Sequence, residues 1–218
     1  MEQTLSEENY LKAIYHLGKT GSEKISATAI AEALGNNPAS VIDMLKKLTD
    51  KKLIQYDKVK GAKLSDKGHK AAIQIVRKHR LWEVFLQEKL GYAWDEVHDI
   101  AEQLEHIQDK QLADRLEKFL NFPEYDPHGD PIPKSNGQLP EASRIMLCDQ
   151  EQGASCRVVG VRDTSPSFLQ YLQQLNITIG TKIKVIEKIV FDESLILNIA
   201  KEKNVTVSKK FAENILVV

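Results

Sequence analysis

The chain has 218 residues, of which 42% are hydrophobic and 28% are charged, and its formal net charge at pH 7 is −1. This length fits two or three compact domains, and the composition is that of an ordinary globular protein. Because no stretch of about 18 uncharged apolar residues occurs and the first ten residues are polar and acidic, we expect neither a membrane span nor a secretory signal.

Apolar spacing near the N-terminus predicts three helices. The first helix is expected to begin at Ser6, a good N-cap, and to end at about Lys19. A second, short helix follows Ser26 and ends before Gly35. Pro38 suits the first turn of a third helix, so the segment has the helix–helix–turn–helix order of a DNA-binding motif.

A basic hairpin is predicted directly after these helices. Two short strands are expected at 53–59 and 62–64, joined through Gly61. Residues 40–70 hold nine Lys against four Asp, a local excess of five positive charges. Three helices followed by a basic hairpin are typical of a winged helix-turn-helix that binds duplex DNA.

The DNA-binding candidates lie on the third helix and in the hairpin. Polar side chains on the exposed face of the third helix can reach base edges, and lysines there and in the hairpin can reach phosphates. A lysine-rich helix is often only a solvated surface, and that alternative stays open. The candidates are Ala39, Ser40, Asp43, Lys46, Lys47, Lys58, Lys60 and Lys63.

Helical periodicity continues in the middle of the chain. A long helix is expected from Asp66 to about Leu90, followed by helices at 94–107 and 109–120. Residues 93–130 hold eleven Asp and Glu against three Lys and Arg, an excess of eight negative charges that suits the binding of cations.

The last third of the chain changes its periodicity. Residues 123–140 contain five of the seven prolines and predict a linker. After the linker, alternation of apolar and polar residues predicts short strands, which favours a small β barrel. We expect strands at 157–161, 182–188, 194–200, 204–208 and 215–218, with one short helix near 168–175.

The sequence HDIAEQLEH, residues 98–106, predicts a metal site. It places two imidazoles and two carboxylates at i, i+4, i+7 and i+8 of one helix, and a further His–Glu pair at i, i+4 precedes it. Solvated helix faces remain the alternative. Imidazole and carboxylate without thiolate suit Mn(II) or Fe(II). These residues are His79, Glu83, His98, Glu102, Glu105 and His106.

The cysteines and the missing catalytic motifs limit the class of protein. Cys148 and Cys156 cannot form a disulfide framework, so they fit a reducing cytoplasm and pack as small core residues. No GxSxG, HExxH, P-loop or dinucleotide-binding motif occurs, so we expect no enzyme. A hydrolytic carboxylate–histidine metal site stays open as an alternative.

Four segments, IAEALGNNPASVIDMLKKL, RKHRLWEVFL, EVHDIAEQLEHI and DPHGDPIP, resemble the diphtheria toxin repressor and manganese transport regulator family. The resemblance implies a cytoplasmic, homodimeric, metal-dependent repressor. It also implies a mostly α fold with a small β barrel. The expected parts are a winged helix-turn-helix domain at 1–72, a helical dimerisation and metal-binding domain at 73–122, a Pro-rich linker at 123–144 and an SH3-like domain at 145–218.

The resemblance also implies ligand roles. Glu102, Glu105 and His106 match the regulatory metal site, completed from the first helix by Asn9. His79, Glu83 and His98 match an adjacent second site. Lys12 stands where manganese-type members can place a further Glu, and Asp163 is the nearest carboxylate for a ligand from the barrel.

The ligand at position 102 bears on the choice of metal. Iron-type members have Cys where this chain has Glu102, which favours Mn(II), with Fe(II) as the alternative. Zn(II) or other divalent ions can occupy such sites in vitro. The resulting hypothesis is a Mn(II)-dependent repressor that binds operator DNA as a dimer and controls metal homeostasis. The alternatives are an Fe(II)-dependent repressor of iron uptake, a metalloenzyme and a metal-storing module.

Overall fold

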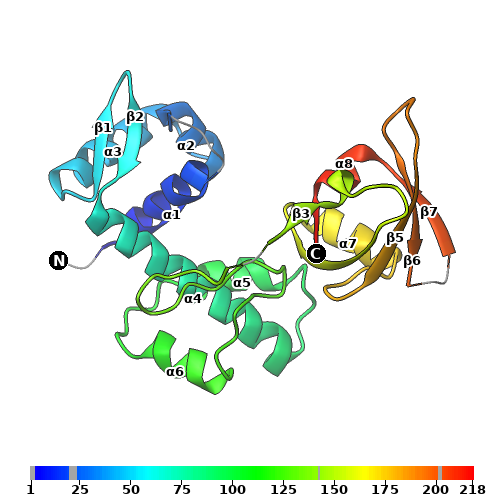
Figure 1. Cartoon of the computed structure of the whole chain (residues 1–218). Helices are drawn as coiled ribbons and strands as arrows, with labels where there is room; N and C mark the ends of the chain where they lie inside the picture. The colour runs from blue at the N-terminus through cyan, green and yellow to red at the C-terminus, as the bar shows by residue number, and fades with distance from the viewer. Residues whose placement is uncertain (1–2, 20–23, 142, 201–202) are drawn as a thin grey trace. The chain divides into compact units, whose positions relative to one another are not determined.

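The computed structural model describes residues 3–19, 24–141, 143–200 and 203–218 (Figure 1). They form two compact units. Unit 1 consists of the described residues of 1–79, 102–116 and 133–138. Unit 2 consists of those of 80–101, 117–132 and 139–218.

Unit 1 contains the winged helix. Its helices pack around a core in which Leu11, Ile30 and Leu45 have no exposed surface. Burying each such side chain stabilises the fold by about 1.5–3 kcal/mol. The elements are α1 (Leu5–Lys19), α2 (Ala27–Leu34), α3 (Pro38–Asp50), β1 (Ile54–Asp57) and β2 (Gly61–Leu64).

Local capping explains where α2 and α3 begin and end. The Ser26 side chain accepts a hydrogen bond from the amide of Ala29 at 3.1 Å, and the Asn37 side chain accepts one from Ala39 at 2.9 Å. Gly35 ends α2 in the left-handed region, with φ of 63°. Ser26 and Gly35 flank α2 as predicted, and Pro38 lies in the first turn of α3. The predicted N-cap of the first helix is wrong, because α1 begins at Leu5 and Ser6 lies within it.

Gly61 allows the hairpin to approach the rest of unit 1. The amide of Ala62 donates to the carbonyl of Ile25 at 2.8 Å. A Cβ atom on Gly61 would lie 2.6 Å from that carbonyl oxygen, and the φ of Gly61 is +82°. Only glycine therefore fits at the start of β2.

Three further helices follow: α4 (Asp66–Leu90), α5 (Val97–Leu104) and α6 (Leu112–Phe119). The bounds of α4 are those predicted, whereas α5 and α6 are shorter than expected. Glu105 and His106 lie in a turn after α5, not on the helix itself. Their side chains contact residues of α1, so tertiary contacts outweigh the helical periodicity of this segment.

Unit 2 contains a six-stranded antiparallel sheet in the order β3-β8-β4-β5-β6-β7. In the part of the chain described, β3 and β7 are its two edges, so the predicted barrel is an open, SH3-like sheet. The strands are β3 (Ile145–Met146), β4 (Ser155–Val161), β5 (Lys182–Lys188), β6 (Leu195–Ile199), β7 (Lys203–Val207) and β8 (Ile215–Val217).

Short helices accompany this sheet. The predicted helix is α7 (Pro166–Gln174), and α8 (Lys209–Glu213) and the 3-10 turn η1 (Leu147–Asp149) were not predicted. The hydrophobic core of unit 2 contains apolar residues of the strands together with Leu169 of α7 and Phe211 of α8. The fold class, mostly helical with a small C-terminal β domain, is confirmed.

The Pro-rich segment forms no helix or strand, as predicted, but it is closely packed. Asp126 and His128 are buried, and the amide of Val161 in β4 donates to the carbonyl of His128 at 2.9 Å. Gly129 has φ of +85°, and a Cβ atom there would lie 2.1 Å from the carbonyl oxygen of Val159. A solvated spacer needs no such glycine.

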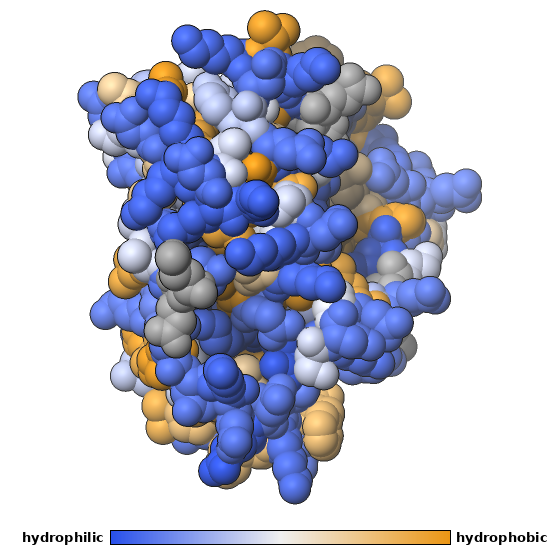
Figure 2. All heavy atoms as spheres, turned by 90° about the vertical axis from the view of Figure 1, so that its left-hand side faces the viewer, coloured by the Kyte–Doolittle hydropathy of each residue, from blue (hydrophilic) through white to orange (hydrophobic). Residues whose placement is uncertain are grey.

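The surface is mainly hydrophilic on the face drawn in Figure 2, where apolar side chains are scattered. Among the described residues, none of the helices combines the length and the apolar character that a membrane crossing requires.

Candidate metal centre and nucleic-acid interface

The predicted DNA-binding residues lie together on one part of unit 1. All are exposed, which is what contacts to a duplex require. Ala39, Ser40, Asp43, Lys46 and Lys47 lie on α3, and Lys58, Lys60 and Lys63 lie on the β1–β2 hairpin.

Two lysines of α3 have acidic partners. Lys46 pairs with Asp43 at 3.1 Å on the exposed surface, where such pairs contribute little. Lys47 lies 3.1 Å from the buried carboxylate of Glu7, which also accepts hydrogen bonds from Lys51 at 2.7 and 2.8 Å. Burial opposes ionisation of Glu7, but Lys51, the Thr4 amide and Lys47 together lower its pKa to about 2. Glu7 therefore ties α1 to α3 as a carboxylate.

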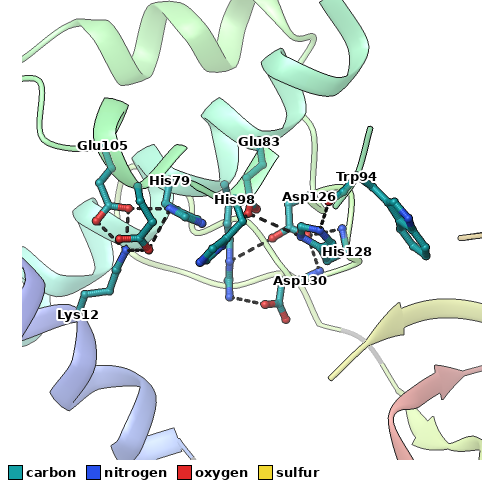
Figure 3. Close-up of polar contacts among 11 residues, drawn as sticks. Lys12, His79, Glu83, Trp94, His98, Glu105, Asp126, His128 and Asp130 are labelled. Atoms are coloured by element: carbon teal, nitrogen blue, oxygen red, sulfur yellow. Dashed lines mark hydrogen bonds and ion pairs between the residues drawn. The ribbon is translucent and has the colours of Figure 1, made fainter. Parts of the chain in front are cut away.

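A cluster of ionisable side chains in unit 1 contains several of the predicted metal ligands. Nδ1 of His79 lies 2.6 Å from Oε2 of Glu105 and 3.8 Å from Oε1 of Glu102. Ligand atoms of these three residues lie within 4.8 Å of one another. Glu105 has no exposed surface, and Nε2 of His106 lies 3.6 Å from its Oε1. Figure 3 shows His79 and Glu105 pointing toward one another.

Helix α1 reaches this cluster through a residue that the sequence analysis did not single out. Nδ1 of His106 lies 2.6 Å from Oε2 of Glu8, which is 3% exposed. The contact leaves Nε2 of His106 on the side of Glu105. A carboxylate on one imidazole nitrogen with the other directed at the ligand set is the usual arrangement around a metal-binding histidine. Glu8 therefore orients His106.

Asn9, the predicted ligand from α1, follows Glu8 in the helix. Its Oδ1 atom is buried and accepts no hydrogen bond from the described residues. A buried carbonyl oxygen without a donor is costly in water-free surroundings, and a divalent cation would satisfy it. The imidazole and carboxylate donors of the cluster, and an orphaned amide oxygen of this kind, are ligand types that a divalent metal accepts.

A second cluster lies within unit 2. An oxygen of Glu83 on α4 lies 3.4 Å from Nδ1 of His98 and 3.6 Å from Nδ1 of His128. The charge of Glu83 also acts on the carboxyl group of Asp126. Ligand atoms of Glu83, Asp126 and His128 lie within 4.8 Å of one another, and all three residues are buried (Figure 3). Three convergent buried ligands of this type can hold a divalent cation.

The buried polar groups of unit 2 hold each other in place. Nε2 of His128 lies 2.7 Å from the carbonyl of Trp94, so Nε2 donates and Nδ1 faces Glu83. Oδ1 of Asp126 accepts from the amides of His128 and Asp130, both at 2.9 Å. Nη2 of Arg80 binds Asp130 at 2.9 Å, and its Nε lies 3.4 Å from Asp126. These bonds set the orientation of the Asp126 and His128 side chains.

The proximity of these groups perturbs their protonation. Burial, with the charges of Glu83 and Asp130, raises the pKa of Asp126 to about 7, although Arg80 and His128 act in the opposite direction. Burial by itself lowers the pKa of His128, but the hydrogen bond and charge of Glu83 and the charge of Asp126 outweigh it and raise the pKa to about 9. Such perturbation is typical of functional sites.

Asp126 and His128 were missed because the prolines around them predict a linker. The signal that could have found them is the order Asp-Pro-His-Gly-Asp, a carboxylate and an imidazole two residues apart in a segment rich in turn formers. Asp163 accepts a hydrogen bond from the amide of Ser165 at 2.9 Å before α7. Asp163 is not in any of the ligand groups that the described residues form.

Three family models match the chain in succession. Residues 3–62 match the iron dependent repressor N-terminal DNA binding domain, residues 65–134 the iron dependent repressor metal binding and dimerisation domain, and residues 145–218 the FeoA domain. The predicted boundaries at 72, 122 and 144 stay a prediction.

Individual proteins are similar to the chain. The iron-dependent repressor IdeR of Mycobacterium bovis is 36% identical over 126 residues, which are 58% of this chain and 54% of that protein. The chain thus spans about half the length of this relative. The transcriptional regulator MntR of Oceanobacillus iheyensis is 36% identical over 120 residues, which are 55% of this chain and 80% of that protein.

Solved structures extend the likeness to the whole fold. A manganese-dependent transcriptional repressor, solved in complex with manganese, has a TM-score of 0.87 and 34% sequence identity. That likeness covers 97% of this chain and 99% of the other.

Proposed function

Because the chain belongs to the iron-dependent repressor family of metal-dependent transcriptional regulators, we propose that it represses transcription by binding operator DNA when loaded with Mn(II). Fe(II) is the alternative corepressor, and the regulated genes would then be those of iron uptake. The observation that carries the proposal is the contact between Glu8 of the winged helix and His106 of the ligand set. Through this contact, binding of a metal by His106 would affect the position of α1.

The residues that would hold the metal are those of the unit 1 cluster, namely Asn9, His79, Glu102, Glu105 and His106. A bound divalent ion would supply two positive charges that join α1 to the end of α5. Glu8 orients the His106 ring, and the core of unit 1 transmits the position of α1 to α3. The metal can favour one position of α1 over another only if it binds the protein more tightly when α1 is in that position.

The unit 2 cluster supports a second metal position. Glu83 and His98 belong to the predicted second site, and Asp126 and His128 lie with them in unit 2. The donors are again imidazole and carboxylate, which suit Mn(II) or Fe(II). Zn(II) binds such ligands tightly as well, so it can occupy these positions in vitro.

DNA binding is proposed for the exposed face of α3 and the β1–β2 hairpin. In this proposal, the side chains of Ser40 and Asp43 contact bases, and those of Lys47, Lys58 and Lys60 contact phosphates. In a homodimer, two such helices would enter major grooves about 34 Å apart, or a multiple of that distance, on a palindromic operator.

Exposed aromatic side chains support the homodimer. Phe119 and Phe122 are 60% and 63% exposed, and the ring of Phe119 lies 6.1 Å from that of Phe85. Large apolar side chains that gather on a surface mark sites of association. A protein that binds chromosomal DNA in a bacterium works in the cytoplasm, which is the location we propose.

Metal-resolved DNA binding tests the proposal. Metal-free protein is titrated onto a panel of genomic duplexes at fixed salt, with Mn(II), with Fe(II) under anaerobic conditions, with Zn(II) or with chelator. Sequence-specific DNA binding that occurs only with Mn(II) or Fe(II) would support the proposed repressor function and identify the activating metal. Equal binding with and without metal contradicts it. Metal-dependent hydrolysis of a phosphoester without specific DNA binding would favour the metalloenzyme.

A further inference from the structure

The side chain of Lys12 lies inside the ligand cluster of unit 1. Its ammonium binds Oε1 of Glu102 and lies 2.7 and 2.8 Å from the two carboxylate oxygens of Glu105. The side chain of Lys12 is 11% exposed, and that of Glu105 is fully buried. Figure 3 shows Lys12 extending from α1 toward these acceptors. A cation of the protein itself therefore occupies the space between the carboxylates.

This position is the one that a divalent ion needs. Ligand atoms of His79, Glu102 and Glu105 lie within 4.8 Å of one another. A divalent ion lies about 2.0–2.2 Å from such oxygens and nitrogens. An ion held by both carboxylates would thus lie within contact distance of the Lys12 ammonium. Two cations so close, away from bulk water, repel each other strongly, so they exclude one another.

We propose that Lys12 is an internal competitor of the metal, which holds Glu102 and Glu105 in the metal-free protein and must leave them before a divalent ion binds. The inference rests on the proposed function for the identity of the site as the regulatory one. The competition itself does not depend on DNA binding, because the single positive charge of Lys12 raises the metal concentration that is needed to occupy the site.

Two consequences follow from this competition. Without metal, Lys12 offsets the repulsion between the buried Glu105 and Glu102 and joins α1 to α5, so the metal-free protein keeps these elements together. With metal, the ammonium is released to solvent. Because coupling between two ligands is reciprocal, the factor by which Lys12 weakens metal binding equals the factor by which metal weakens the Lys12 contacts.

Lys51 supplies a matched control. Its ammonium lies 2.7 Å from Oε1 of Glu7, a buried carboxylate on α1, and Glu7 belongs to none of the metal-ligand groups among the described residues. Lys12→Met and Lys51→Met remove the same charge and keep similar volumes. Both remove a lysine from a buried glutamate: Lys12→Met from Glu105, among the proposed metal ligands, and Lys51→Met from Glu7, outside them.

Binding of Mn(II) to the full chain measures the effect. Free Mn(II) is counted by electron paramagnetic resonance during titration of wild type, Lys12→Met and Lys51→Met. We expect Lys12→Met to bind one Mn(II) on the order of tenfold more tightly, within the roughly 5- to 150-fold range of typical coupling. Lys51→Met should match wild type. The gain should vanish when Glu105→Gln is added. Unchanged or weaker Mn(II) binding by Lys12→Met overturns the inference.

Amine labelling tests the same displacement in the wild-type chain, where folding of a variant is no concern. An amine-reactive ester is applied with and without saturating Mn(II), and the labelling rate of Lys12 is read by peptide mass spectrometry. We expect faster labelling of Lys12 with Mn(II) and an unchanged rate for Lys51. Equal rates at Lys12 overturn the inference. If Mn(II) binds but does not promote DNA binding, the proposed function fails while the competition by Lys12 stands.

Discussion

Nδ1 of His106 lies 2.6 Å from Oε2 of Glu8, so a buried carboxylate of the first helix holds the imidazole that follows α5. The other oxygen of Glu8, Oε1, accepts a hydrogen bond from the side-chain Nε2 of Gln108 at 2.7 Å. This residue pair joins a helix of the winged helix to the proposed metal-ligand set within unit 1. Glu8 is therefore expected to affect metal binding through His106.

Glu8→Gln is expected to weaken Mn(II) binding by about 10- to 100-fold, because the carboxylate fixes the orientation of the His106 ring. Competition with a chelator of known affinity measures the change. Gln108→Ala is the control, since it removes a partner of Glu8 and leaves the contact with His106. Equal Mn(II) affinities for Glu8→Gln and wild type would show that Glu8 does not act through His106.

Glu105→Ala is expected to leave the protein folded and to abolish metal-dependent DNA binding. The side chain is fully buried and contacts both His79 and Lys12, so its loss removes a central acceptor of the cluster. Fluorescence anisotropy of a labelled operator with and without Mn(II) measures the response. Glu88→Ala, at an exposed position of α4, is the control. A full Mn(II) response of Glu105→Ala would remove Glu105 from the metal ligands.

Lys47→Ala is expected to weaken DNA binding and to lower its salt dependence, because each phosphate contact releases about one counterion. The slope of log affinity against log salt should fall by about 0.9. Lys89→Ala, beyond the DNA-binding candidates at the end of α4, should leave the slope unchanged. If both variants have the wild-type slope, Lys47 makes no phosphate contact.

Glu7 is expected to make the stability of the protein depend on acid. Its folded-state pKa of about 2 lies below the ordinary value of 4.5, so its contribution is present above about pH 4.5 and is lost as the pH falls toward 2. Glu7→Gln should lower the free energy of unfolding at neutral pH by about 1–3 kcal/mol. Urea unfolding at several pH values should show this difference shrinking in acid. A difference that stays constant with pH would contradict the assignment.

His128→Gln is expected to remove one bound Mn(II) per chain, because His128 is one of three buried side chains in unit 2 whose ligand atoms lie close enough together to hold an ion. Counting bound Mn(II) at saturation by electron paramagnetic resonance measures this number. His69→Gln, an exposed histidine at the start of α4, is the control and should keep the wild-type number. The same number in His128→Gln would restrict metal binding to other residues.

Much of the fold follows from the sequence because its signals are local. The N-caps at Ser26 and Asn37, the left-handed Gly35 and the apolar spacing of α4 act over a few residues, so α2, α3 and α4 begin and end close to where they are expected. At Glu105 and His106 the local signals predict the wrong structure. Helical periodicity extends across them, yet α5 ends at Leu104 where contacts with α1 take over.

The sequence also predicts a metal-ligand set, since His79, Glu102, Glu105 and His106 have the spacing and chemistry of metal ligands, and the assignment stays a prediction. The tertiary structure alone decided which groups surround them. It placed Glu8 at His106, Lys12 between the two glutamates, and Asp126 and His128 beside Glu83. These partners come from segments far apart in the chain, and no periodicity relates them. Their proximity depends on the path of the backbone through the packed core, which only the folded chain defines.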